Sequence, residues 1–296
     1  MTNKTTSIQG PGGLPMVSIE NHLAQALVSL YGGQVLSFRP RGEEQVLFTS
    51  SKSLYERGQA IRGGVPVCWP WFDPHASDKS KPMHGFARLC EWTINHTETT
   101  SDGATRIELE LHETPHSMTL WPHPFTLKLI VTVGLSLRIE LQAKNRSDET
   151  VEITGALHTY LKVAEAEHTH ITGLDDTFFS DALAEHRVNL QRGKLIVNEE
   201  INRIYRETET TCILHDPGID RQLVVQKSGS RSTVIWNPWK ERAAALPDLG
   251  DEDYRNMVCI EAANTLHDAV RLAPGESHAL ATEIGLISYA SMLPPL

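Results

Sequence analysis

A regular alternation of apolar and polar residues over positions 127–141 is the strongest constraint that this sequence places on its fold. Every odd position in this segment is apolar, and the even positions are mostly polar. Because successive side chains of a β-strand point to opposite faces, a period of two indicates strands with one buried face. The segment is longer than a typical strand, so Gly134 is predicted to mark a turn between two strands.

Further segments repeat this period, and helical signals are few. After a predicted turn at "KNRSDET", apolar residues recur on one face over 151–163. The segments "QLVVQKS" and "STVIWN" are predicted to pair around Gly229, and "LAPGESHAL" is predicted to turn before a last apolar segment. At most "SLYERG" is expected to form a short helix. The sequence therefore predicts a mainly β protein: one large antiparallel β-sandwich domain over 1–296, with its core over about residues 20–290.

Composition and charge exclude several functional classes. The chain has 296 residues and a formal net charge of -10, which argues against a general nucleic-acid binder. The N-terminal segment lacks the apolar region of a secretory signal, and no apolar run is long enough for a membrane span. The four cysteines are scattered, with no CxxC pair. We therefore expect a reduced, cytoplasmic monomer with neither a membrane nor a nucleic-acid partner.

One histidine and one glutamate stand in apolar surroundings. In "LHTYLKV", His158 lies on the strand face opposite Leu157 and Leu161, so its side chain is expected to point to solvent or a cleft. In "MVCIEAAN", Glu261 alternates with Met257 and Cys259. A buried carboxylate must be paired, solvated or raised in pKa. A histidine and a glutamate suit acid–base catalysis near neutral pH, although each is more often structural, and periodicity does not show that the two meet.

Two loop segments, "AIRGGVPVCWPWFDP" and "MHGFARLCEW", combine arginines with aromatic residues, and "VIWNPW" adds Trp236 and Trp239. Arginine forks match phosphate geometry, and aromatic rings stack on the C–H face of a sugar. The alternative is that the tryptophans pack in the core and the arginines pair with carboxylates. The segment "EAEHTH" (165–170) is a weak candidate for a metal site, since no companion motif supports it. Motifs for phosphate loops, dinucleotide binding and serine hydrolases are absent from the sequence.

Four segments, "IRGGVPVCWPWF", "HGFAR", "LHTYL" and "CIEAAN", together resemble the hexose-6-phosphate mutarotases, also called glucose-6-phosphate 1-epimerases. These belong to the galactose mutarotase-like superfamily of large β-sandwiches. The resemblance runs from about residue 20 to about residue 290, and its specific part is the RGG–Pro–aromatic loop combined with HGFAR.

The resemblance implies a function and assigns roles to individual residues. It implies interconversion of the α and β anomers of a hexose 6-phosphate, D-glucose 6-phosphate in particular, with no cofactor and no metal. His158 matches the family's general acid and Glu261 its general base. Arg62 and Arg88 match the arginines that hold the sugar phosphate, and His84 belongs to the motif that lines the same cleft.

Further positions match the family or depart from it. Trp236 lies in the segment that matches another wall of the cleft, and Asn202 stands where relatives often have an aspartate that hydrogen-bonds the substrate. Met83 replaces a glutamine that contacts substrate in some members. Two other functions stay open from the residues alone. One is a non-catalytic carbohydrate-binding module, and the other is a glycoside hydrolase or lyase, which usually needs two carboxylates.

Overall fold

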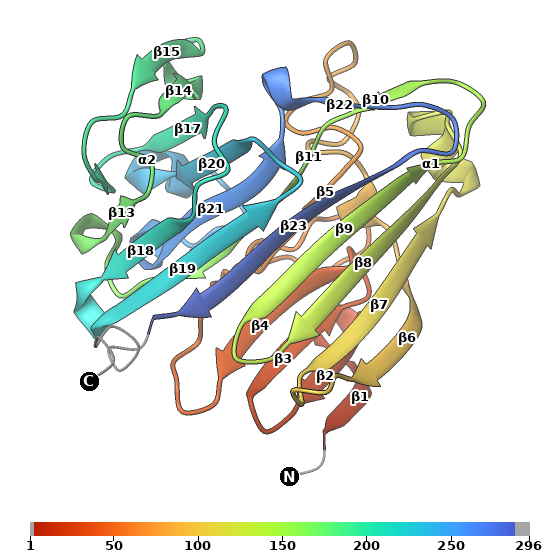
Figure 1. The fold of residues 1–296 in the computed structure, drawn as a ribbon, viewed down its shortest axis with the longest axis horizontal. Coiled ribbons are helices and arrows are strands. Elements are labelled where there is room, and N and C mark those ends of the chain that lie inside the picture. Colours follow the sequence, from red (N-terminus) through yellow and green to blue (C-terminus); the bar gives the residue numbers. More distant parts are fainter. Residues whose placement is uncertain (1–2, 288–296) are drawn as a thin grey trace.

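The computed structural model describes residues 3–287, and its strands form four sheets in which neighbouring strands run antiparallel (Figure 1). One sheet has the order β1 (Lys4–Gln9), β2 (Pro15–Glu20), β3 (Ala24–Ser29), β4 (Gln34–Pro40). A two-stranded sheet pairs β10 (Val151–Ile153) with β22 (Val270–Leu272). The last residues of the predicted core span, 288–290, lie outside the described part of the chain.

Two large sheets make up most of the molecule. The eight-stranded sheet has the order β15 (Arg187–Leu190), β14 (Phe178–Asp181), β17 (Ile201–Tyr205), β20 (Ser232–Asn237), β21 (Met257–Asn264), β11 (Gly155–Leu157), β5 (Val67–Cys68), and β12 (Tyr160–Lys162) also pairs with β21. The nine-stranded sheet has the order β16 (Leu195–Ile196), β13 (His170–Thr172), β18 (Cys212–Asp216), β19 (Arg221–Ser228), β23 (Ser277–Leu286), β9 (Leu137–Asn145), β8 (Phe125–Val133), β7 (Thr105–His112), β6 (Thr93–Thr99).

Helices are short in the described residues. The α-helices are α1 (Pro115–Leu120) and α2 (Trp239–Ala244). The 3₁₀ turns cover Pro11–Gly13, Ala87–Leu89, Ala166–His168, Ala182–Ala184, Pro217–Ile219, Asp253–Asn256 and Leu266–Asp268. No helix within residues 3–287 is long and apolar enough to cross a bilayer. The predicted mainly β, antiparallel architecture with few short helices is confirmed.

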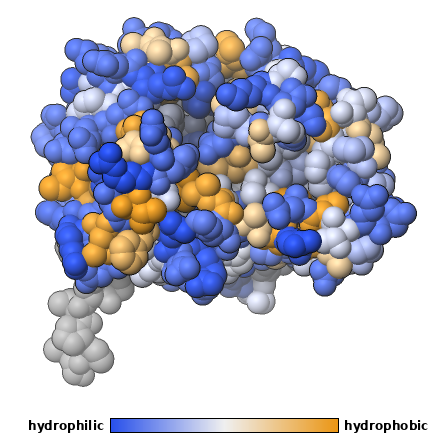
Figure 2. All heavy atoms as spheres, turned by 90° about the horizontal axis from the view of Figure 1, so that it is seen from above, coloured by the Kyte–Doolittle hydropathy of each residue, from blue (hydrophilic) through white to orange (hydrophobic). Residues whose placement is uncertain are grey.

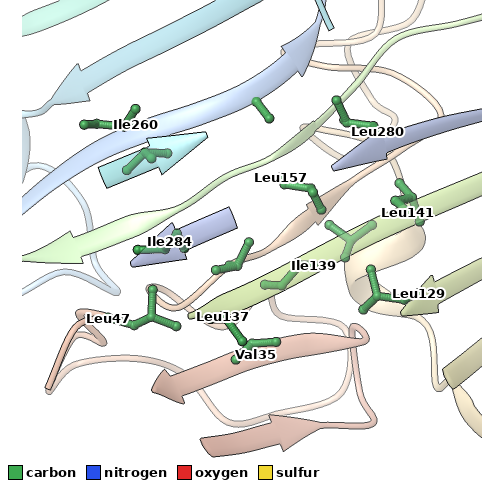
Figure 3. Close-up of a cluster of buried hydrophobic side chains, with 14 of the residues drawn as sticks. Val35, Leu47, Leu129, Leu137, Ile139, Leu141, Leu157, Ile260, Leu280 and Ile284 are labelled. Atoms are coloured by element: carbon green, nitrogen blue, oxygen red, sulfur yellow. The ribbon is translucent and has the colours of Figure 1, made fainter. Parts of the chain in front are cut away.

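The main core lies between the two large sheets (Figure 3). From the nine-stranded sheet it takes Ile139 and Ile284, and from the eight-stranded sheet Leu157 and Ile260, all at most 1% exposed. Full burial of such a side chain contributes about 1.5–3 kcal/mol, so the alternating pattern determines which face of each strand turns inward. On the face shown in Figure 2, hydrophilic residues predominate and hydrophobic ones form separate patches.

The structure confirms one predicted turn and corrects a strand pairing. Strand β8 ends at Val133 and β9 begins at Leu137, so the chain does reverse at Gly134. However, β19 and β20 do not pair around Gly229. Strand β19 pairs with β18 and β23, whereas β20 pairs with β17 and β21. Each strand buries one face in the same core, and therefore they belong to opposite layers rather than to one hairpin.

Two further local predictions have different outcomes. The segment "SLYERG", residues 53–58, forms no helix. The predicted turn in "LAPGESHAL" is present, because β22 ends at Leu272 and β23 begins at Ser277.

Candidate active site

Strand β21 places Glu261 on the face of the eight-stranded sheet that points away from the main core. Val258 and Ile260 lie in the main core, whereas Met257 and Cys259 belong to a separate cluster on the other side. This alternation confirms the strand register predicted from the sequence. On the neighbouring strand β20, Val234 lies opposite Glu261 and Trp236 opposite Cys259. Glu261 therefore stands in a row of side chains on the outer face of the sheet.

His158 lies between two short strands rather than within one, which corrects the sequence prediction. Strand β11 ends at Leu157, just before His158, and β12 begins at Tyr160, just after it. Both strands pair with β21. The backbone N–H of His158 donates to the carbonyl of Pro66 at 3.0 Å instead of to a strand partner. The imidazole stacks on the ring of Tyr160, with centroids 4.7 Å apart and an interplanar angle of 11°. This interruption turns the histidine toward β21.

The structure brings the histidine and the glutamate together. Nδ1 of His158 lies 3.3 Å from Oε1 of Glu261. His158 is 7% exposed and Glu261 is 1% exposed. Among residues 3–287, Nδ1 of His158 and Oε2 of Glu261 have no hydrogen-bond partner. Buried polar atoms are nearly always satisfied in folded proteins, so two orphaned atoms at one place indicate a site built for a ligand.

Burial moves the two pKa values in opposite directions. It raises the pKa of Glu261 well above its usual range, and the charge of Asp73 adds to that shift. It lowers the pKa of His158 well below its usual range, and the positive charges of Arg62 and Arg88 lower it further. Desolvation penalises the charged form of each group. Burial therefore favours the neutral form of each group, the protonated carboxyl group of Glu261 and the unprotonated imidazole of His158.

The "RGG" loop positions Arg62 at the edge of this pair. The guanidinium of Arg62 forms a bidentate ion pair with Asp248, with N–O distances of 3.0–3.1 Å, and donates to the hydroxyl of Tyr160 at 3.0 Å. Gly64 has φ of +60°, and a Cβ there would lie 2.1 Å from the carbonyl oxygen of Val35. Glycine is therefore required for the loop to pass this close to the neighbouring backbone.

The "HGFAR" segment supplies a second histidine and a second arginine. Nδ1 of His84 accepts a hydrogen bond from the backbone N–H of Asp73 at 3.0 Å, so the proton of the neutral ring is on Nε2. Burial lowers the pKa of His84 well below its usual range, which keeps this ring neutral. Nη2 of Arg88 donates to the carbonyl of Met83 at 2.8 Å, whereas its Nε is buried without a partner.

Gly85→Ala is expected to destabilise the protein by more than Gly42→Ala does. Both glycines have a positive φ, which costs an L-residue about 1–2 kcal/mol. A Cβ at Gly85 would also lie 2.0 Å from the carbonyl oxygen of Trp69, whereas nothing lies within 4 Å at Gly42. Such overpacking costs about 1–3 kcal/mol more. Denaturant unfolding of both variants measures the difference, and equal losses would contradict the close packing at Gly85.

One cavity of about 510 Å³ contains all the predicted site residues. Its lining includes the seven side chains predicted from the sequence: Arg62, His84, Arg88, His158, Asn202, Trp236 and Glu261. Met83, the second departure from the family pattern, also lines it. These residues come from distant segments, between Arg62 and Glu261. The loops that carry Arg62, His84 and Arg88 meet the outer face of the eight-stranded sheet at this cavity.

Sequence reasoning missed several residues of this cavity. Asp73, Glu200 and Arg242 line it and were not predicted, whereas Phe72 belongs to the aromatic loop segment that the sequence does indicate. The partner of Arg62, Asp248, was also missed, because the two residues are 186 positions apart and no local pattern connects them. Tyr160 had a usable signal, since it shares the even-numbered face with His158.

The tryptophans divide between the core and the cavity. Trp69, Trp71 and Trp92 are buried in the main core, as the packing alternative predicts. Trp236 lines the cavity and meets the imidazole of His158 edge-on, with ring centroids 5.8 Å apart.

The segment "EAEHTH" does not assemble a metal site. His168 ends a 3₁₀ turn and His170 begins β13, so the two do not share a strand face. Within residues 3–287, the group of potential metal ligands that does lie close together is His158, Cys259 and Glu261.

Comparison with known proteins identifies the family. The aldose 1-epimerase family model matches residues 15–285. A protein of Escherichia coli K12 named "Putative glucose-6-phosphate 1-epimerase" is 33% identical over 251 residues, which cover 84% of this chain and 83% of the relative. A protein of the same name from Cenchrus ciliaris is 32% identical over 279 residues, covering 91% and 84%.

A solved structure shows the same fold. The crystal structure of a Salmonella typhimurium protein described as a "putative mutarotase" superimposes with a TM-score of 0.89 at 28% identity, covering 96% of this chain and 94% of the other. The family match favours an epimerase over a non-catalytic carbohydrate-binding module. Since the family model covers nearly the whole described chain, this protein belongs to the aldose 1-epimerase family, with the galactose mutarotase-like fold.

Proposed function

We propose that this protein interconverts the α and β anomers of hexose 6-phosphates, D-glucose 6-phosphate in particular. The observation that carries the proposal is the buried contact of 3.3 Å between Nδ1 of His158 and Oε1 of Glu261, in a cavity that also contains arginines. The names of the relatives in Escherichia coli and Cenchrus ciliaris support the choice of glucose 6-phosphate. We place the reaction in the cytoplasm, where thiols such as the four free cysteines remain reduced.

In the proposed mechanism, Glu261 is the general base and His158 the general acid. The carboxylate removes the proton from the C1 hydroxyl while the imidazolium donates its proton to the ring oxygen, so the C1–O5 bond breaks and an aldehyde forms. Rotation about the C1–C2 bond then presents the other face of the aldehyde, and the reverse transfers close the ring. Each positioned group contributes about 10²–10⁴-fold.

The proton content of the pair suits both halves of this cycle. Ring opening leaves the proton on Glu261 and His158 neutral, which is the distribution that burial favours in the resting site. Before ring opening, the same proton is on His158, so that the imidazolium and the carboxylate of Glu261 both face the sugar. Since the pair carries one proton in both states, the reaction needs no net exchange of protons with solvent.

Arg62 and Arg88 are proposed to hold the phosphate. The charge of Arg62 is compensated by Asp248, whereas Arg88 has a carbonyl and no carboxylate among its hydrogen-bond partners. A phosphate dianion would supply the missing countercharge and an acceptor for the buried Nε. It would also offset the positive charges that lower the pKa of His158, and so favour protonation of the acid.

Two-dimensional exchange NMR of glucose 6-phosphate, with glucose as the comparison, tests the proposed function. The protein is expected to accelerate exchange between the α and β signals of the phosphosugar far more than that of glucose. Equal acceleration of both sugars would retain the mutarotase and remove the phosphate preference. Binding of the phosphosugar without acceleration would overturn the proposal.

A further inference from the structure

The cluster of His158, Cys259 and Glu261 has the composition of a site for a soft divalent metal ion. One ligand atom from each residue, a ring nitrogen, Sγ and a carboxylate oxygen, lies within 4.8 Å of the other two, and all three residues are buried. The combination of imidazole, thiolate and carboxylate is one that zinc binds, whereas magnesium and calcium prefer oxygen ligands. The types of ligand alone therefore favour zinc over magnesium and calcium.

The spacing of the ligand atoms fits a tetrahedral ion. With Zn–N and Zn–O bonds of about 2.0–2.1 Å, the nitrogen and oxygen of a tetrahedral site lie about 3.3–3.4 Å apart. Nδ1 of His158 and Oε1 of Glu261 are 3.3 Å apart. The longer Zn–S bond of about 2.3 Å requires a nitrogen–sulfur separation of about 3.6 Å, and the three ligand atoms lie within 4.8 Å of one another.

The polar atoms at this place lack partners. Nδ1 of His158 and Oε2 of Glu261 are both buried without a hydrogen bond. A metal would therefore displace no hydrogen bond at these two atoms. Three protein ligands also leave one tetrahedral position for a water or hydroxyl group from the cavity.

We propose that a thiophilic divalent ion such as Zn²⁺ binds reversibly to His158, Cys259 and Glu261 and thereby inhibits the enzyme. The ion would coordinate the lone pairs of His158 and Glu261 that the proposed proton transfers require. The binding site is independent of the proposed function, whereas the inhibition rests on it. Cys259 has no role in the proposed proton transfers. Its thiolate would contribute to metal binding without taking part in the reaction.

Binding is expected to tighten as the pH rises. The thiol must lose its proton to ligate the ion, and so must the carboxyl group of Glu261. Each ion bound near neutral pH therefore releases protons, and raising the pH favours the complex.

Cobalt(II) chloride is the probe that reports the thiolate directly. Wild-type protein is expected to develop a thiolate-to-cobalt charge-transfer band and the visible bands of tetrahedral cobalt, and Zn²⁺ should remove both by displacement. Cys259→Ala should lose the charge-transfer band, whereas Cys212→Ala should retain it. Cys212 is a matched control because it is equally buried, at 1% exposure, in the opposite sheet.

The outcomes separate the metal site from the proposed function. Absence of the band in wild-type protein, or an unchanged band in Cys259→Ala, would overturn the site, and the wild-type titration decides even if the variant does not fold. Zn²⁺ should inhibit anomerisation over the concentrations at which it displaces cobalt, with an inhibition constant at least about tenfold weaker in Cys259→Ala. A cobalt band without inhibition would support the site and overturn the roles of His158 and Glu261.

Discussion

Glu261→Gln is expected to lower kcat/KM for anomerisation of glucose 6-phosphate by about 10²–10⁴-fold while stabilising the fold at neutral pH. Glutamine preserves the shape of the side chain and cannot accept the proton of the C1 hydroxyl. His158→Asn should cause a loss of similar size, because it removes the acid. Glu108→Gln, a change of the same kind on β7 in the other large sheet, is the control for activity.

The gain in stability should depend on pH, with a sign set by burial. Burial raises the pKa of Glu261 above its value in the unfolded chain. Below the unfolded value of about 4.3 the carboxyl group is protonated in both states. As the pH rises above this value, the unfolded chain releases the proton and the folded protein keeps it, so wild-type stability falls until the pH passes the folded pKa. Glutamine has no such loss.

Thermal unfolding of wild type and Glu261→Gln at about pH 4 and pH 7 measures this effect. The advantage of the variant should be small at the lower pH and should grow by about 1.4 kcal/mol for each pH unit above the unfolded pKa, until the pH reaches the folded pKa. An advantage equal at both values would contradict the raised pKa. A less stable variant at pH 7 would show instead that the pair rests as a carboxylate beside an imidazolium. Wild-type activity in the variant would exclude Glu261 as the base.

The sequence predicts best what local periodicity determines. The hairpin of β8 and β9 and the register of β21 follow from alternation, because burial of one face admits only one register. Periodicity does not identify the partner of a strand. Gly229 looks like a hairpin turn, yet the chain there crosses from one large sheet to the other, so β19 pairs with β18 and β23, whereas β20 pairs with β17 and β21.

The candidate site shows the same division. The resemblance to the mutarotases nominated seven residues that the fold gathers around one cavity. The interruption that turns His158 toward β21 was not visible, because the apolar residues on either side continue the strand pattern without a break. The pairing of Arg62 with Asp248 was equally invisible, since it depends on how the loop after α2 returns to the sheet. Contacts between distant segments thus decide the electrostatics of the site.

Those electrostatics distinguish the two phosphate arginines in a way that mutation can test. Arg62 has a carboxylate partner, and its side chain is 20% exposed beside an Asp248 that is 15% exposed. Removing one member of such a pair leaves the other charge partly buried and uncompensated. Arg62→Ala therefore combines a loss of stability with a loss of phosphate binding. Arg88 has no carboxylate partner among its hydrogen bonds, and its removal tests phosphate binding more directly.

Arg88→Ala is expected to lower kcat/KM for glucose 6-phosphate by about 10–100-fold and to leave kcat/KM for glucose nearly unchanged. A hydrogen bond to a charged group contributes about 1.5–3 kcal/mol, and each 1.4 kcal/mol corresponds to a factor of ten. Anomer-exchange NMR with both sugars measures the ratio, with Arg106→Ala, a surface arginine on β7, as the control. Equal losses for the two sugars would show that Arg88 shapes the loop through its bond to Met83. A loss confined to the phosphosugar would support a direct role in phosphate recognition, because only that substrate carries a negative charge and an acceptor for the buried Nε of Arg88.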